Sequence, residues 1–340
     1  MRLIGATAPP TLAATTRLTI LGVNLNGAGE RACLEGGLPF RLGYEFTNCR
    51  PDWGNSMAEI ADIEYRFCPA CLREVNAFLP GPGGRPNARC PLCHSLQRHR
   101  FLALLLAAYA PEISDSRYVL EVAPSRNVTR MLRRASRGEY VGIDIDPAAD
   151  GRTVRVAADL CRAPFADGVF DTSVCFHVFK HIPDDMSAMR EYSRLIAPHG
   201  IGFIQNPWRP SAPTQEDPDA SPEERTQRFG QADHVRIYGS DFDDRLKSAG
   251  LQPRCLFPGR VISAGTMEVM AITKHPPIWV VNGEKSRLRS LSDSEFEADA
   301  RIRVQRTLNE SKEWPLSVRG EQIRRKRRKM RWLPGKGRTR

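Results

Sequence analysis

The sequence predicts an α/β protein: a parallel sheet with helices on both faces, a small cysteine-rich module ahead of it, and a basic tail behind it. Short apolar runs alternate with helical spacers from residue 118 onward, a rhythm typical of parallel sheets. Four of the nine cysteines form two Cys-x-x-Cys pairs within 68–93. Eleven Lys and Arg residues gather in 319–340. These patterns divide the chain into a metal-binding module, a sheet domain and a charged extension.

The N-terminal part contains two different segments. Residues 1–56 are rich in Thr, Gly, Ala and Pro without a sustained period, so they stay unassigned, with Met57 as an alternative start. Residues 57–110 hold the cysteine pairs and a predicted helix over 95–110, where apolar side chains recur at three-to-four spacing. We expect residues 57–110 to form a zinc ribbon and a linking helix.

The cysteine spacing C-x2-C-x18-C-x2-C is typical of a structural zinc site. Two cysteines around a tight turn direct both sulfurs to one point, and two such turns complete a tetrahedral thiolate shell without an open catalytic position. Reduced structural cysteines are the alternative, and the odd total argues against a disulfide framework. The predicted zinc ligands are Cys68, Cys71, Cys90 and Cys93.

The sheet domain is predicted over 111–278. Strands are expected at 118–123, 140–145, 153–157, 171–176 and 200–205, with helices at 127–135 and 185–196. A helix at 241–249 and two final strands at 252–257 and 266–273 complete a seven-stranded sheet. Residues 279–340 are predicted to be a weakly ordered basic extension, because the periodic pattern weakens there.

Acidic residues mark three strands of this predicted sheet. Glu121 lies in the first strand, Asp144 ends the second, and Asp159 follows the third. An acid at the end of the second strand accepts hydrogen bonds from ribose hydroxyls in dinucleotide-binding folds. No GxGxxG motif is present, which disfavours a nicotinamide cofactor. Solvated strand ends in another doubly wound protein are the alternative.

The series of these acids, Asp159-Leu160, and Pro-Phe followed by Phe-Asp before the fourth strand resembles class I S-adenosylmethionine-dependent methyltransferases of type 11. The chain is also similar to a narrower bacterial group of zinc-ribbon methyltransferases over about residues 65–275. The motifs that carry this second likeness are Cys90–Arg100, Val119–Pro124, His177–Asp185 and Phe229–Gly239. The resemblance implies a Rossmann-like methyltransferase sheet with S-adenosylmethionine as cofactor.

The same resemblance implies roles for individual residues. Glu121 and the backbone at Ala123 would meet the amino acid end of the cofactor, and Asp144 would bind the ribose. Asp159 and Leu160 would bracket adenine. His177 would lie beside the methionine moiety. The chain departs from the family pattern in two places: Ala123-Pro-Ser replaces the glycine-rich loop, and Lys180 stands where an acid is commoner.

The acceptor side is expected after the fifth strand, where open α/β sheets bind ligands. The run from Asp233 to Gly239 concentrates polar side chains in a few positions. His234 is the preferred general base, Arg236 a clamp for a carboxylate or phosphate, and Tyr238 a hydrogen-bond donor. His181 is the second candidate base. A lid or loop that only orders the pocket is the alternative for this run.

The distribution of charge along the chain indicates which kinds of partner it could bind. The formal net charge is +11, and 319–340 alone carries +10, so the remaining body is close to neutral. A near-neutral body favours a small-molecule, sugar or lipid-linked methyl acceptor. Residues 319–340 could contact nucleic acid or anionic lipid, or be a solvated tail.

Two other functions stay open. One is an RNA methyltransferase that uses the zinc ribbon and tail, and the other is a non-catalytic zinc-dependent interaction protein. The sequence contains no apolar stretch of transmembrane length and no signal-peptide pattern. We therefore expect a cytoplasmic protein without a transmembrane segment.

Overall fold

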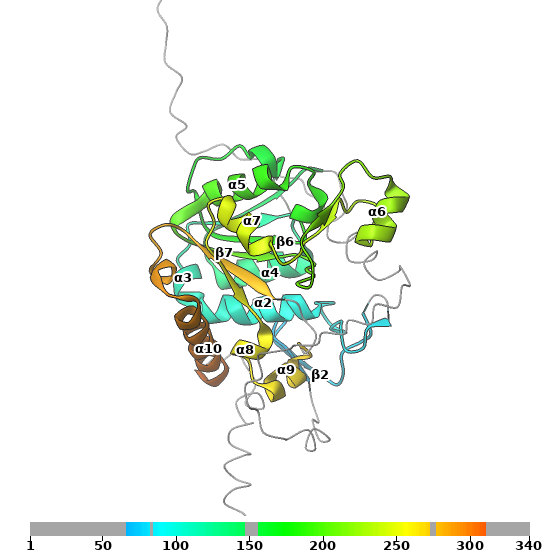
Figure 1. Ribbon diagram of the computed structural model, residues 1–340. Helices are drawn as coiled ribbons and strands as arrows, with labels where there is room; N and C mark the ends of the chain where they lie inside the picture. The colour runs from blue at the N-terminus through cyan, green and yellow to red at the C-terminus, as the bar shows by residue number, and fades with distance from the viewer. Residues whose placement is uncertain (1–65, 82–83, 147–155, 273–276, 311–340) are drawn as a thin grey trace, which may run out of the picture.

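The core of the protein is a seven-stranded sheet in the order β10-β11-β7-β6-β3-β4-β5 (Figure 1). This computed structural model describes residues 66–81, 84–146, 156–272 and 277–310. The predicted Rossmann-like α/β class is confirmed. The strands are β3 (Tyr118–Val122), β4 (Glu139–Asp144), β5 (Val156–Ala157), β6 (Phe170–Phe176), β7 (Ile196–Gln205), β10 (Pro253–Leu256) and β11 (Ile278–Asn282).

Five neighbouring strands of the sheet, from β5 to β7, are parallel. β11 is antiparallel to both of its neighbours and lies between β7 and β10, with Val281 opposite Gly202 and Pro253 opposite Val281. Its sequence is Ile-Trp-Val-Val-Asn, and its four apolar residues suit a strand buried on both faces. The carboxyl ends of β3, β4, β6 and β7 consequently meet at one edge of the sheet.

Helices cover both faces of the sheet. Along β11, Ile278 and Val280 pack with α2, α4 and α10, whereas Trp279 and Val281 pack with α5 and α7 on the other face. Figure 1 shows this separation of the helices. Their bounds are α2 (Gln97–Ala108), α3 (Ala110–Ile113), α4 (Arg126–Ala135), α5 (Asp185–Leu195), α6 (Pro222–Phe229), α7 (Phe242–Ser248), α8 (Pro258–Val261), α9 (Ala264–Met270) and α10 (Asp293–Glu310).

Side-chain caps fix the start of helices that begin near the carboxyl edge of the sheet. The hydroxyl of Ser125 accepts a hydrogen bond from the Val128 amide at the start of α4, and Asp184 caps α5 through the Ser187 amide. Three short 3-10 turns also occur at 160–162, 179–181 and 287–290. Two of these turns directly follow a strand end, so they place side chains beside the sheet's carboxyl edge.

The N-terminal module consists of a small hairpin and the loops that carry the cysteines. β1 (Arg66–Cys68) pairs antiparallel with β2 (Arg73–Val75), and Leu79 forms a bridge with Arg89. Helix α2 follows directly and is buried on nearly all sides. A helix buried all round belongs to the core. α2 therefore joins the module firmly to the sheet domain.

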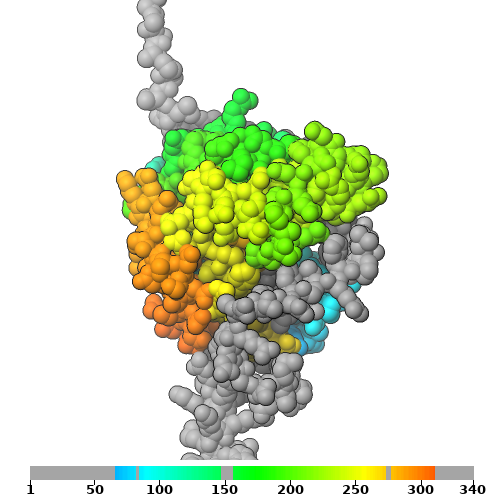
Figure 2. Space-filling model, in the orientation of Figure 1, coloured from blue at the N-terminus to red at the C-terminus, as the bar shows by residue number. Residues whose placement is uncertain are grey.

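A second two-stranded sheet belongs to the segment after β7. β8 (Gln215–Glu216) pairs with β9 (Arg236–Ile237), and α6 lies between them in sequence. Ser221 and Glu224 form a capping box at the start of α6, and Gly230 ends the helix with a φ of 89°. Figure 2 shows the α6 segment on the opposite side of this face from α10.

Two predictions about the C-terminal part are wrong. The segment 266–273 was expected as the last strand, but Ala264–Met270 is a helix, α9, and the last strand is β11. Ser263 caps α9 through the Thr266 amide, a local signal that outweighs the apolar run. The weakly ordered extension predicted for 279–340 is wrong for its first part, because residues 279–282 belong to β11 and Asp293–Glu310 forms α10, which packs against α2 and α8. Residues 311–340 lie outside the described residues.

The remaining expectations for tails and loops concern residues that the structure does not describe. The unassigned segment 1–56, the alternative start at Met57, the first three positions of the strand predicted at 153–157, and the basic run 319–340 lie outside the described residues. Among the helices that the structure describes, none has the length and apolar character needed to cross a membrane.

Candidate functional site

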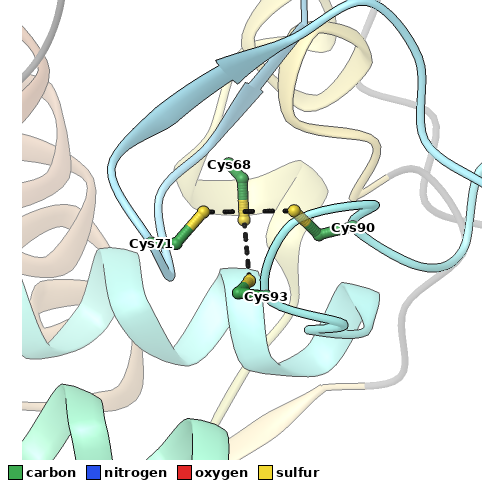
Figure 3. A group of neighbouring side chains, drawn as sticks. All are labelled: Cys68, Cys71, Cys90 and Cys93. Atoms are coloured by element: carbon green, nitrogen blue, oxygen red, sulfur yellow. Dashed lines mark hydrogen bonds between the residues drawn. The ribbon is translucent and has the colours of Figure 1, made fainter.

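The four predicted zinc ligands converge on one point (Figure 3). The sulfurs of Cys68 and Cys93 are 3.7 Å apart, and those of Cys71 and Cys90 are 4.0 Å apart. A tetrahedral zinc ion with ordinary zinc–sulfur bonds separates its sulfurs by about 3.8 Å. These two separations are close to that value, so the cluster is compatible with zinc.

The two Cys-x-x-Cys turns have the same backbone conformation. The amide of Leu72 donates to the Cys68 carbonyl at 2.8 Å, and the amide of His94 donates to the Cys90 carbonyl at 3.0 Å. Leu72 and His94 both have positive φ, 59° and 61°. Each lies directly after the second cysteine of its pair, so this conformation turns the chain back and leaves the sulfurs facing inward. His94 is a turn residue and its side chain is exposed.

Hydrogen bonds within the cluster favour thiolates at two positions. The bond from Cys68, followed by that from Cys71, lowers the pKa of Cys93 and lowers the pKa of Cys90 to about 6. The Ser95 hydroxyl also lies 3.1 Å from the Cys93 sulfur. The pKa values of Cys71 and Cys68 are raised instead, that of Cys71 chiefly by its hydrogen bond with Cys68. Two of the four sulfurs therefore favour the thiolate, the form that binds metal.

Arg100 connects the module to the C-terminal half of the chain. Its side chain is fully buried, and its guanidinium donates to the carbonyls of Ala88 and Ser95 at 3.1 and 2.9 Å. The same group donates to Met270 and Ala271 at 2.7 and 2.8 Å. One cation therefore holds the cysteine loop against the end of α9.

The predicted cofactor acid Glu121 is buried in β3 and holds the loop that follows. Its carboxylate accepts hydrogen bonds from the Ser125 amide at 2.6 Å, the Thr129 hydroxyl at 2.7 Å and the Tyr140 hydroxyl at 2.5 Å. The loop passes through Ala123, whose φ is 50°. This positive φ shows how the chain makes a sharp turn there without glycine.

The other predicted cofactor residues lie at the same edge of the sheet. Asp144 is the last residue of β4, is 3% exposed, and accepts a hydrogen bond from the Asp146 amide at 3.2 Å. Asp159 caps the turn at 160–162 through the Cys161 amide at 2.8 Å, and Leu160 is buried next to it. The roles implied for these residues stay predictions.

His177 follows β6, which is the neighbour of β3 in the sheet. It has a φ of 62°, so two adjacent strands both end in left-handed backbone. Such strained conformations cluster at ligand-binding sites. Its Nδ1 lies 3.2 Å from the Lys180 ammonium. Burial, and then the charges of Arg98 and Lys180, lower the pKa of His177 well below its usual value.

The two candidate bases His181 and His234 lie side by side. Their ring centroids are 4.9 Å apart with the rings nearly perpendicular. His181 Nδ1 lies 3.0 Å from the Asp233 carboxylate, and His234 Nδ1 lies 2.9 Å from the Phe229 carbonyl. The Nε2 atoms of both histidines are buried and have no hydrogen-bond partner in the described part of the chain.

Arg236 and Tyr238 are held by protein groups. Arg236 is buried and donates to Glu216 at 2.9 Å, to the carbonyl of Phe179 at 2.9 Å, and to that of Pro183 at 2.7 Å. A further bond goes to the Ile182 carbonyl. These contacts disfavour the predicted anion clamp, because they use the guanidinium donors within the fold.

Tyr238 is also buried, and its hydroxyl donates to Asp185 at 2.7 Å. Asp185 in turn accepts from Arg245 at 2.7 Å. This arrangement links α5 and α7 to the residue that follows β9, and it disfavours Tyr238 as a donor to the methyl acceptor.

Two relevant residues were not found from the sequence. Asp185, the first residue of α5, is buried among Arg236, Tyr238 and Arg245. Asn206 follows β7, is fully buried, and neither polar atom of its side chain has a partner among the residues described. The signal for Asn206 was its position after the fifth strand, beside the predicted ligand edge.

Comparisons with known proteins agree with this architecture. Residues 120–204 match a family model described as a methyltransferase domain. No curated protein sequence matches the chain.

Three solved structures are similar to part of this chain. A putative methyltransferase in complex with the Trm112 activator of Haloferax volcanii is 16% identical, with 55% of this chain and 90% of that chain covered and a TM-score of 0.38. An S-adenosylmethionine-dependent methyltransferase from Mesorhizobium loti is 14% identical, with coverages of 52% and 94% and a TM-score of 0.36. The 1,6-didemethyltoxoflavin-N1-methyltransferase of Burkholderia thailandensis is 14% identical, with coverages of 53% and 76% and a TM-score of 0.33.

Proposed function

Since this chain carries a methyltransferase domain, we propose that it transfers a methyl group from S-adenosylmethionine to a small-molecule acceptor at the carboxyl edge of the sheet. The observation that carries the proposal is the gathering of Ala123, Asp144, His177 and Asn206 at the ends of β3, β4, β6 and β7. Open α/β sheets bind ligands at this edge.

The residues at this edge suit the parts of the cofactor. Asp144, at the end of β4, offers carboxylate oxygens to the ribose hydroxyls, and Asp159 and Leu160 would bracket adenine. Buried polar atoms without a protein partner in the described part of the chain, His177 Nε2 and both side-chain atoms of Asn206, suit a polar ligand. The cofactor would supply an electrophilic methyl group on a sulfonium.

Glu121 acts on the cofactor through the loop that follows β3. Its carboxylate fixes the Ser125 amide and the Thr129 hydroxyl, so the backbone at Ala123 is held in the turned conformation. A fixed loop lowers the entropic cost of ligand binding. We therefore assign Glu121 to positioning this loop, whereas Asp144 would contact the cofactor directly.

The zinc cluster is proposed to be structural. Four thiolates fill a tetrahedral shell and leave no position for substrate. Arg100 bonds to the carbonyls of Ala88 and Ser95 in the cysteine loop and to those of Met270 and Ala271 outside it. Zinc bound by Cys68, Cys71, Cys90 and Cys93 would keep this loop, and with it the start of α2, in place.

The near-neutral charge outside 319–340 favours a small acceptor over a nucleic acid. An RNA acceptor gripped by residues 319–340 is the competing proposal. Full-length protein and a variant ending at Glu310 are compared for RNA binding at increasing salt. Tight binding that depends on salt and on the tail would favour the RNA acceptor.

The proposed function is tested by calorimetry of S-adenosylmethionine and S-adenosylhomocysteine with the full-length, zinc-loaded protein. We expect one cofactor molecule to bind per chain. A chain that is folded and zinc-loaded but binds neither compound would contradict the proposal and favour a non-catalytic interaction protein.

A further inference from the structure

The hydrogen bonds around His181 and His234 define which ring nitrogen carries the proton. His181 Nδ1 faces two acceptors, the Asp233 carboxylate at 3.0 Å and the Asp233 carbonyl at 3.2 Å. His234 Nδ1 faces the Phe229 carbonyl at 2.9 Å. Neither neighbour can donate, so both Nδ1 atoms must carry the proton. In the neutral rings, both Nε2 atoms then present a lone pair.

His177 has the opposite tautomer. Its Nδ1 lies 3.2 Å from the ammonium of Lys180, which can only donate, so Nδ1 accepts and Nε2 carries the proton. His177 follows β6 directly, and His181 lies in the turn at 179–181 just beyond it. Two lone pairs and one N–H donor therefore belong to the three histidines beside this end of the sheet.

Asp233 distinguishes His181 from His234. Burial acts to raise the pKa of Asp233, but the hydrogen bond and charge of His181 outweigh it and lower this pKa to about 2. Asp233 is thus a carboxylate at neutral pH, and it lies 3.0 Å from His181 Nδ1. For His234, burial and then the charge of Lys180 lower the pKa to about 3, so its ring resists protonation.

We propose that His181, oriented by Asp233, is the base that takes the proton of the methyl acceptor, while His234 Nε2 accepts a hydrogen bond from the same molecule. The acceptor is therefore a compound whose nucleophilic atom carries a proton, a hydroxyl or an amine. This inference rests on the proposed function, and it replaces His234 by His181 as the base. Asp233 is a positioning residue.

The proposed step balances in atoms and charge. The acceptor oxygen or nitrogen forms a bond to the transferred methyl carbon as the methyl–sulfur bond breaks, and that electron pair stays on sulfur. The proton of the acceptor moves to His181 Nε2, which gives an imidazolium beside the Asp233 carboxylate. The positive charge of the sulfonium thereby ends on His181, where Asp233 offsets it.

A metal ion is the other ligand that two imidazoles and a carboxylate suit, and one ligand atom from each of these three residues lies within 4.8 Å of the others. Two observations weigh against it. The Asp233 carboxylate already receives the His181 Nδ1 proton at 3.0 Å. The ammonium of Lys180 acts on His234 strongly enough to lower its pKa, and a second cation nearby would be repelled.

The test is NMR of the imidazole nitrogens in ¹⁵N-histidine-labelled, zinc-loaded protein near pH 7. The chain has seven histidines, so His181→Gln, His234→Gln and His177→Gln spectra assign the relevant signals. We expect the Nδ1–H tautomer at His181 and His234 and the Nε2–H tautomer at His177. An Nε2–H tautomer at His181 would overturn the proposal, because that ring could not accept the proton.

The variant Asp233→Asn tests whether Asp233 orients the His181 ring or only supports the fold. We expect the strongly downfield Nδ1 proton of His181 to move upfield in this variant, while the His234 signals and the unfolding temperature stay nearly unchanged. A His181 proton that does not move would overturn the role of Asp233. His199→Gln is the matched control, because His199 is exposed.

Two further measurements keep the outcomes distinct. Cobalt(II) added to the zinc-loaded protein should not bind stoichiometrically, and tight binding lost in both His181→Gln and His234→Gln would overturn the proposal in favour of a metal site.

S-adenosylmethionine affinity should be unchanged in His181→Gln. If wild-type protein fails to bind the cofactor, the proposed function fails. If it binds but the tautomers differ from those expected, only this inference fails.

Discussion

The Nε atom of Arg100 donates a hydrogen bond of 2.7 Å to the carbonyl oxygen of Met270, although 170 positions separate the two residues. The same guanidinium bonds to Ala88 and Ser95 in the cysteine loop. Its charge is buried, with a pKa lowered to about 10 by burial, so it stays protonated at neutral pH. The zinc module and the C-terminal half therefore depend on one shared cation.

Replacing Arg100 should destabilise the whole chain. Arg100→Met leaves several buried carbonyls without a donor, and we expect a loss of about 3 kcal/mol or more in the free energy of unfolding. Arg100→Lys should recover only a small part, because an ammonium cannot reach the same set of carbonyls. Urea unfolding measures both variants, with exposed Arg130→Lys as the control. An Arg100→Met protein as stable as wild type would contradict this account.

Zinc should be required for the fold. We expect about one zinc per chain by elemental analysis, and a lower unfolding temperature after removal by a strong chelator. Cys90→Ser should lose the metal, whereas Cys161→Ser, outside the cluster, should retain it. Metal-free wild-type protein with an unchanged unfolding temperature would show that the cysteines act as reduced structural thiols.

Asp144 should determine cofactor affinity. Loss of a charged hydrogen-bond acceptor in Asp144→Ala should cost about 1.5–3 kcal/mol, roughly tenfold or more in the dissociation constant. Asp146→Ala, two positions further on, is the control. Equal S-adenosylmethionine affinity in wild type and Asp144→Ala, measured by calorimetry, would mean that the ribose lies elsewhere.

Arg236 and Tyr238 should behave as structural residues. Arg236→Ala leaves the buried carbonyls of Phe179 and Pro183 without the guanidinium that donates to them, and we expect a loss of about 3 kcal/mol or more in unfolding free energy. Tyr238→Phe removes a donor to Asp185 and should cost about 1–3 kcal/mol. Chemical unfolding measures both. If either variant keeps wild-type stability, the predicted contact with the methyl acceptor regains support.

The stability of the fold should fall as the pH drops below 6.5, and His234 should contribute to this. Its folded pKa is lowered to about 3, below the unfolded value of about 6.5. The unfolded chain therefore binds more protons between these values, so the His234 contribution is complete above pH 6.5 and is lost toward pH 3. It amounts to about 1.4 kcal/mol per pH unit in that window.

His234→Gln should reduce this slope. Unfolding free energies of the variant and wild type are compared at several pH values from 7 to 4.5, with His199→Gln as the exposed control. Parallel curves for wild type and His234→Gln would show that the His234 ring is not held neutral by burial.

The sequence predicted the parts of the fold that depend on local pattern. The alternation of apolar runs identified five parallel strands, and the cysteine spacing identified the four sulfurs that meet in Figure 3. The last strand was misplaced because 266–273 and 278–282 are both apolar, and periodicity does not distinguish a short buried helix from a strand. The Ser263 cap, which decides between them, is a weaker signal.

The residues predicted for the acceptor side could not be resolved into roles from the sequence. The run from Asp233 to Tyr238 concentrates polar side chains, and the structure places His234 beside His181, a contact that the sequence did not predict. Arg236 and Tyr238 turn instead toward Asp185 and the turn before α5. Neighbouring residues in this short strand and its flanks contact different partners. Only tertiary packing decides which of their side chains form bonds within the fold.

The position of β11 has a consequence for how this protein is made. The strand lies inside the sheet between β7 and β10, yet among the strands of the described residues it is the last one that the ribosome produces. Until residue 282 has emerged, β7 and β10 have no common neighbour and their edges are open to other chains. A nascent chain that stalls before this point should therefore need a chaperone, and a nonsense mutation between 257 and 277 should yield an aggregation-prone product rather than a smaller enzyme.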